Sequence, residues 1–148
     1  MKEIFVIGKS GQLALALQRL DPGAGFADRV FGRDEADLAH PDAVEAMERT
    51  QRPAAVINAA AYTQVDKAED EEDLATRINA DGPGALARAC AALRVPLVHV
   101  STDYVFAGDK AGPYFVPDPI APVNAYGRSK AKGEAAVLNA VGPAAVVR

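Results

Sequence analysis

Short apolar runs alternate with helical stretches along the whole chain, and this order predicts an α/β fold with a doubly wound parallel sheet. The run Ile4–Ile7 is apolar at every position, which is typical of a strand that is covered on both faces. The 148 residues are 49% hydrophobic and 24% charged, as in an ordinary globular domain. We therefore expect residues 1–148 to form a single domain.

Each element of this fold has its own local signal. The five expected strands are the apolar runs at residues 4–7, 29–32, 54–57, 97–100 and 144–147. The four expected helices cover residues 11–20, 41–53, 72–93 and 124–140. Pro41 suits the first helical position, and Ala43, Val44 and Met47 follow at helical spacing. The triplet Gly82-Pro83-Gly84 predicts an interruption of the third helix.

Composition excludes several classes of protein. The single Cys90 rules out a disulfide framework and a cysteine-based zinc site, and two isolated histidines predict no metal centre. The net charge is −4 without long blocks of either sign, which argues against nucleic-acid and membrane partners. The chain enters its first strand without a signal peptide, so a cytoplasmic location is expected. It ends on an apolar strand, which leads us to expect a longer protein.

The first strand runs into a glycine turn, Gly8 to Ala14, with the spacing G-x-x-G-x-x-A. Glycines permit a tight turn and a close approach of the backbone to a pyrophosphate, and the following helix start offers free N–H groups. A Walker-type phosphate loop is rejected because Glu3 stands where its first glycine is needed. A simple strand-to-helix turn remains the alternative. The position after the first strand favours a dinucleotide and a Rossmann-like, NAD(P)-binding sheet.

Two further strand ends complete the expected cofactor site. Arg33 is the first charged residue after the second strand, and a guanidinium there accommodates the 2′-phosphate of NADP. Asp34 and Glu35 follow at once, so the choice between NADP and NAD stays open. After the third strand, the small residues 59–61 allow a flat group to lie against the backbone, although tight packing explains them equally.

Tyr126 and Lys130 are four positions apart in an expected helix, so they project from one face. A lysine ammonium near a tyrosine hydroxyl lowers the tyrosine pKa and makes it an acid/base group near neutral pH. The pair alone could arise by accident. With the hydroxyls of Ser101 and Thr102 upstream, it forms the Ser/Thr–Tyr–Lys constellation of short-chain dehydrogenases/reductases.

Four stretches together resemble the dTDP-4-dehydrorhamnose reductases, a family of extended short-chain dehydrogenases/reductases. They are residues 8–13, residues 58–69, residues 101–106 and residues 124–134. The resemblance implies the reduction of the carbon 4 ketone of dTDP-4-dehydro-6-deoxy-L-mannose to dTDP-L-rhamnose. It also implies NADPH as the cofactor, with NADH left open, and a dTDP-sugar as the partner. The family continues for about as many residues again, with a substrate domain and dimer contacts.

The resemblance assigns catalytic roles residue by residue. Tyr126 would donate the proton, and Lys130 would bind the nicotinamide ribose and lower the Tyr126 pKa. Thr102 would bond to the reacting oxygen, and Asp103 would contact the sugar. Asn79 could take the structural or relay role of the family's asparagine. The cofactor-binding residues would be Gly8, Ser10, Gly11, Gln12, Leu13, Arg33, Asp37, Leu38, Ala60, Ala61, Tyr62, Thr63, Tyr126 and Lys130.

Other functions remain open. A related nucleotide-sugar epimerase would share these motifs. A dehydratase is disfavoured, because dehydratases usually show a Thr-Asp-Glu run where this chain has Thr102-Asp103-Tyr104. A non-catalytic NAD(P)-binding or regulatory module would share the fold, but the presence of both Tyr126 and Lys130 argues against it.

Overall fold

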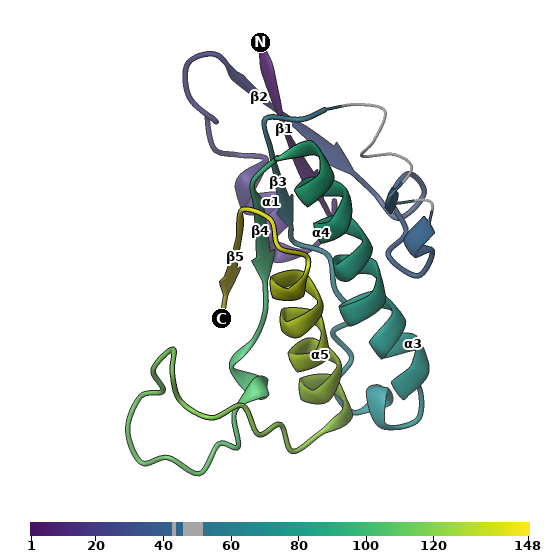
Figure 1. The fold of residues 1–148 in the computed structure, drawn as a ribbon. Helices are drawn as coiled ribbons and strands as arrows, with labels where there is room; N and C mark the ends of the chain where they lie inside the picture. The colour runs from purple at the N-terminus through teal and green to yellow at the C-terminus, as the bar shows by residue number, and fades with distance from the viewer. Residues whose placement is uncertain (43, 46–51) are drawn as a thin grey trace.

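The computed structural model describes residues 1–42, 44, 45 and 52–148, which form a parallel sheet of five strands in the order β2-β1-β3-β4-β5 (Figure 1). The strands are β1 (Lys2–Ile7), β2 (Phe26–Phe31), β3 (Ala55–Asn58), β4 (Leu97–Val100) and β5 (Ala144–Val147). All five expected strands are present within a few residues of their predicted bounds. The predicted fold class is confirmed.

The helical elements connect the strands in chain order. They are α1 (Gln12–Leu17), the 3-10 turn η1 (Lys67–Glu69), α3 (Glu72–Thr76), the π-helical turn η2 (Arg77–Asp81), α4 (Gly82–Leu93), the 3-10 turn η3 (Asp103–Val105) and α5 (Ala125–Asn139). Residues 41, 42, 44 and 45 of the predicted second helix are helical. The rest of its apolar pattern, at residues 43 and 47, lies outside the described residues.

The predicted interruption at Gly82-Pro83-Gly84 is wrong, because the helix continues from α3 through η2 into α4. Pro83 directly follows the π turn, so its missing backbone N–H falls where the helix changes from the π to the α hydrogen-bond pattern. The π turn before it widens the helix by one residue. Gly82 permits the crossing with the chain after β2, since a Cβ at Gly82 would come 2.5 Å from the Leu38 carbonyl oxygen.

The main core lies between the sheet and the helices α4 and α5, which cover one face together (Figure 1). Its fully buried side chains include Phe5, Phe31, Leu86 and Leu97. The rings of Phe5 and Phe31 meet edge to face with their centroids 4.8 Å apart. The core thus fixes α5 against the sheet, with its amino-terminal end near the carboxyl ends of the strands.

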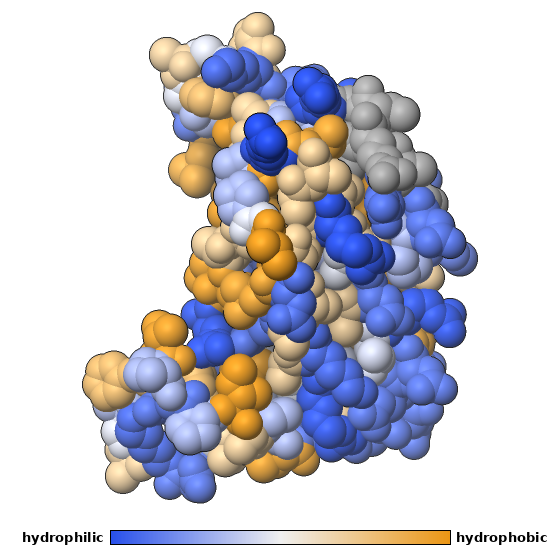
Figure 2. All heavy atoms as spheres, in the orientation of Figure 1, coloured by the Kyte–Doolittle hydropathy of each residue, from blue (hydrophilic) through white to orange (hydrophobic). Residues whose placement is uncertain are grey.

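The opposite face of the sheet is covered unevenly. Val6 of β1 is fully buried, Val98 of β4 is partly exposed, and Val147 of β5 is 50% exposed. Figure 2 shows apolar side chains gathered toward the β5 edge, while hydrophilic side chains cover the surface over α3. Among the helices of the described residues, none is both long and apolar enough to span a membrane.

Candidate active site

A cleft of about 380 Å³ opens at the carboxyl ends of β1 and β3, which we call the cofactor cleft. In the sheet, β1 lies between β2 and β3, so the strand order reverses direction at β1. Open α/β sheets bind their ligands at such a topological switch point. The lining residues are Gly8, Lys9, Ser10, Gly11, Gly32, Arg33, Ala36, Asp37, Leu38, Ala59, Ala60, Ala61, Thr63 and Ile78.

Gly8 is required at the floor of the cofactor cleft for two reasons. Its φ of +112° is unfavourable for a residue with a side chain. A Cβ here would also lie 3.1 Å from both the Ala59 carbonyl carbon and the Ala60 nitrogen. Gly11 differs, because its φ is −73° and a Cβ would have open space. The floor is therefore bare backbone, as a bound pyrophosphate requires.

Arg33 and Asp37 form an ion pair at the edge of the cofactor cleft, with 3.2 Å between Arg33 Nε and Asp37 Oδ2. Burial tends to raise the Asp37 pKa, but the Ala39 N–H and the Arg33 guanidinium outweigh it and lower the pKa. The Arg33 side chain is 76% exposed. Its guanidinium is therefore a cation at the cleft that solvent and ligands can reach.

The segment after β3 is held by buried side-chain amides. Asn79, in the π turn η2, accepts a hydrogen bond from the Tyr62 N–H (2.8 Å) and donates to the Tyr62 carbonyl oxygen (2.9 Å). The same Asn79 amide donates to Ser129 Oγ on α5 at 2.9 Å. Asn79 thus joins the wall of the cofactor cleft to α5, which supports the structural role that the resemblance suggested.

The Tyr62 side chain does not face the cofactor cleft. Its hydroxyl donates to Glu71 at 2.8 Å, and burial together with the Glu71 carboxylate raises its pKa to about 12. The predicted contact of Tyr62 with the nicotinamide is therefore restricted to its backbone. Gln12 and Leu13 form the first turn of α1 and do not line the cleft.

Tyr126 and Lys130 are both buried on one face of α5, as their spacing predicted. The helix begins at Asn124, whose side chain accepts a hydrogen bond from the Gly127 N–H at 2.7 Å. Lys130 Nζ donates to the Val100 carbonyl oxygen at 2.6 Å, at the end of β4. The helix therefore places this pair beside residues 101–103, which contain Thr102 and Asp103.

The prediction that Lys130 lowers the Tyr126 pKa is wrong for this structure. Burial raises the Tyr126 pKa, a hydrogen bond with Thr102 lowers it less, and Asp103 and Tyr104 raise it further. The Lys130 ammonium is instead bonded to Val100, and burial lowers its own pKa to about 8. Tyr126 therefore keeps its proton at neutral pH, which is the form that a proton donor needs.

Sequence reasoning missed two parts of this region. Ile78 lines the cofactor cleft without any recognisable local signal. Around Lys130 lies a polar cluster, which consists of the buried His99, Lys130 and Glu134 and the partly exposed Ser101 and Arg148. The spacing of Lys130 and Glu134, again four residues, was the available signal.

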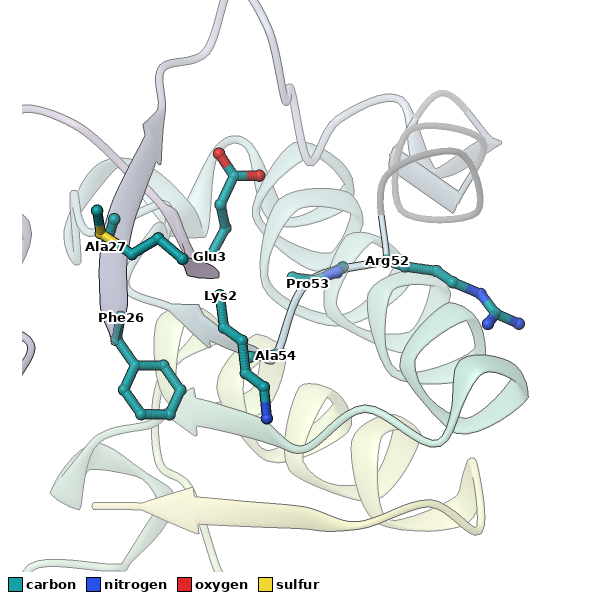
Figure 3. Close-up of a pocket in the computed structure, with 8 residues that line it drawn as sticks. Lys2, Glu3, Phe26, Ala27, Arg52, Pro53 and Ala54 are labelled. Atoms are coloured by element: carbon teal, nitrogen blue, oxygen red, sulfur yellow. The ribbon is translucent and has the colours of Figure 1, made fainter. Parts of the chain in front are cut away.

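A larger open hollow of about 740 Å³ lies at the opposite end of the sheet, where β1 and β2 begin. Figure 3 shows Lys2, Glu3 and Arg52 pointing in different directions around it, so their charged groups do not converge on a ligand. Parallel sheets bind ligands at their carboxyl ends, which is the other end of these strands. We assign this hollow no role. The described residues also contain no group of three or more His, Cys, Asp or Glu placed to hold a metal ion.

The parallel sheet, the glycine turn at its switch point and the buried Tyr–Lys pair define a Rossmann-like domain of the NAD(P)-binding type. The profile of one family, described as RmlD substrate binding domain, matches residues 1–148, and the chain belongs to this family. The resemblance read from the motifs is confirmed.

Individual relatives agree with this assignment. The dTDP-4-dehydrorhamnose reductase of Mycolicibacterium smegmatis is 45% identical over 148 residues, which cover 99% of this chain and 45% of that protein. The crystal structure of the Bacillus anthracis dTDP-4-dehydrorhamnose reductase in complex with NADP has a TM-score of 0.93 and 37% identity, and the match covers 99% of this chain and 52% of that one. The Bordetella bronchiseptica enzyme WbmG, solved with NAD, shares only the fold, with a TM-score of 0.79 and 22% identity over 99% of this chain and 52% of its own. The chain spans about half the length of the curated relatives that it matches.

Proposed function

We propose that this chain is the cofactor-binding and catalytic part of an NADPH-dependent reductase that converts the carbon 4 ketone of dTDP-4-dehydro-6-deoxy-L-mannose to the alcohol of dTDP-L-rhamnose. The observation that carries the proposal is the burial of Tyr126 and Lys130 on one face of α5, beside Thr102 at the carboxyl end of β4. Relatives that carry the name of this reductase, one of them solved with NADP, support the substrate and the cofactor.

The residues present fit a dinucleotide phosphate. The bare backbone at Gly8 leaves room for a pyrophosphate, and Ser10 and Gly11 line the same space. The Arg33 guanidinium suits the 2′-phosphate, because charge-assisted hydrogen bonds to phosphate are its strongest contacts. Ala60, Ala61 and Thr63 form the wall nearest to Asn79 and would hold the nicotinamide end. When bound, NADPH supplies the hydride that the ketone carbon accepts.

The chain's own residues supply the proton and the orientation. Tyr126, protonated at neutral pH, donates its proton to the ketone oxygen as the carbon accepts the hydride, so the C=O bond becomes CH–OH. Thr102, which lies close enough to Tyr126 to lower its pKa, would orient that hydroxyl and the reacting oxygen. Lys130 would bind the ribose hydroxyls, and Asp103 would contact the sugar. Holding these groups in place supplies part of the rate enhancement.

The test compares two tyrosine variants of the full-length protein with the dTDP-keto sugar and NADPH. Tyr126→Phe keeps the ring and removes the proton, so turnover should fall by ~10²–10⁴ while NADPH affinity stays unchanged. Tyr104→Phe is the matched control, because Tyr104 packs edge to face on Tyr126 at 5.5 Å and is 46% exposed. It should keep most of the turnover. Wild-type turnover in Tyr126→Phe would refute the assigned proton donor.

Cofactor binding is tested separately by hydrogen exchange with and without NADPH. Protection should appear at residues 8–13 and 58–63. Binding without turnover would favour the non-catalytic module, and a reversible change of sugar configuration would favour the epimerase. The homodimer and the cytoplasmic location stay predictions from the sequence.

A further inference from the structure

A third residue continues the row that Tyr126 and Lys130 form on α5. Glu134 follows Lys130 by four positions, and the two side chains are each only 1% exposed. Charged side chains are almost never buried to this degree unless they are paired. The proposed function uses Tyr126 and Lys130 but gives no role to Glu134.

The Glu134 carboxylate joins α5 to the ends of two strands. Ser101 Oγ, directly after β4, donates to Glu134 Oε1 at 2.5 Å. Arg148, directly after β5, donates to both carboxylate oxygens, from Nε at 2.9 Å and from Nη2 at 2.7 Å. Such a two-point guanidinium–carboxylate pair fixes direction as well as distance. Glu134 therefore holds in place Ser101, the residue before Thr102.

His99 contributes no charge to this polar cluster. Burial lowers its pKa to about 3, so the ring is neutral at physiological pH. Asn58 Oδ1 accepts from the Ala60 N–H, which leaves the Asn58 Nδ2 amide to donate to His99 Nδ1 at 3.0 Å. The ring proton is therefore on Nε2, the one buried side-chain N or O atom in the described part of the chain without a hydrogen-bond partner.

Lys130 is consequently surrounded by few compensating charges. Glu134 lies one turn later on α5, neutral His99 faces it from β4, and Tyr126 lies one turn earlier. Arg148, directly after β5, pairs with Glu134 and so offsets part of its negative charge. Burial favours the neutral amine of Lys130, and within the described residues Glu134 is the charge that opposes this effect.

We propose that Glu134 is a positioning residue of the catalytic centre, which keeps the buried Lys130 in its ammonium form and ties the strand end before Thr102 to α5 through Ser101. The proposal rests on the proposed function only for the task of Lys130. An ammonium can donate to two ribose hydroxyls and still keep its bond to the Val100 carbonyl, whereas a neutral amine has one donor fewer.

The test measures the titration of Lys130 by NMR in chains with isotope-labelled lysine, with the signal assigned through Lys130→Arg. Glu134→Gln keeps the shape and removes the charge, so the Lys130 pKa should fall by about 1 unit or more. NADPH affinity should then weaken severalfold at pH above neutral and stay unchanged at lower pH. Glu72→Gln removes a carboxylate of α3 that pairs with Arg128 of α5, and should change neither quantity.

A second variant keeps the proposal testable if Glu134→Gln does not fold. Arg148→Gln removes the positive charge behind Glu134, so the Lys130 pKa should rise. A purely structural role would lower the melting temperature without moving the titration, and an unmoved titration in the folded variants would overturn the proposal. Because the titration needs no cofactor, its result is separate from a failure of the wild type to bind NADPH, which would overturn the proposed function instead.

Discussion

The cofactor cleft and the polar cluster lie at the same edge of the sheet, but they are built from different parts of the chain. The floor of the cleft is backbone and small side chains, with Gly8 against Ala59 and Ala60. The polar cluster consists of polar and charged side chains. Its central carboxylate, Glu134, bonds to Ser101 and Arg148. One region depends on empty space, and the other on the pairing of buried charges.

The two regions should therefore fail in different ways. A cleft with a floor of backbone is damaged by adding atoms. A buried cluster is damaged by removing a partner or by changing a charge, since each unpaired buried group retains its full desolvation cost.

Acid should weaken the polar cluster before it affects the cleft. The folded-state pKa of His99, about 3, lies below its ordinary value of 6.5, so the unfolded chain binds more protons as the pH falls through this window. The free energy of unfolding should fall by about 1.4 kcal/mol per pH unit below pH 6.5, or about 3 kcal/mol by pH 4.5. Urea unfolding at each pH measures the slope.

Two variants test whether the His99 imidazole causes this dependence of the unfolding free energy on pH. His99→Gln should flatten the slope, because glutamine does not titrate and can accept from Asn58. His40→Gln should keep it, since the His40 side chain is 73% exposed. An unchanged slope in His99→Gln would place the acid sensitivity outside the cluster.

Removing the Asn79 amide, which joins the wall of the cofactor cleft to α5, should destabilise the protein and weaken cofactor binding. Asn79→Ala leaves the buried N–H and carbonyl of Tyr62 without their partner, and it removes the bond that Ser129 Oγ accepts. The expected loss is about 2 kcal/mol of unfolding free energy, with weaker NADPH binding. Urea unfolding and NADPH fluorescence measure the two effects. Asn139→Ala, at the exposed end of α5, is the control and should change neither.

Adding one methyl group should damage the cleft only where there is no space. Gly8→Ala places a Cβ against the Ala59–Ala60 backbone at a positive φ, and should cost about 1.5 kcal/mol of stability and most NADPH binding. Gly11→Ala meets open space at a normal φ, and its stability should stay within about 0.5 kcal/mol of the wild type. Equal losses of stability in thermal unfolding would contradict the steric account of Gly8.

Arg33→Ala should have the smallest effect, because the Arg33 side chain is largely exposed. NADPH affinity should fall roughly fivefold, about 1 kcal/mol, while NADH affinity stays unchanged. Fluorescence titration with both nucleotides measures the ratio. Arg19→Ala, which does not line the cofactor cleft, is the control. Equal losses for NADPH and NADH would show that Arg33 does not contact the 2′-phosphate.

Much of the cofactor cleft could be read from local sequence, because most of its parts directly follow a strand. Apolar runs predicted the five strands, and parallel strands bring their carboxyl ends to one edge. The glycine at position 8 and the small residues 59–61 were recognisable by their place after a strand. The four-residue spacing of Tyr126 and Lys130 was enough to place them on one helix face.

The electrostatics could not be read in the same way. Tyr126 has a raised pKa, and Lys130 bonds to a strand carbonyl 30 residues away. Glu134 meets Ser101 across 33 residues, and Asn79 meets Ser129 across 50. Local pattern determines secondary structure, since this depends on periodicity and turn chemistry. A pKa depends on burial and on which charges lie nearby, and both are set only when distant segments pack together.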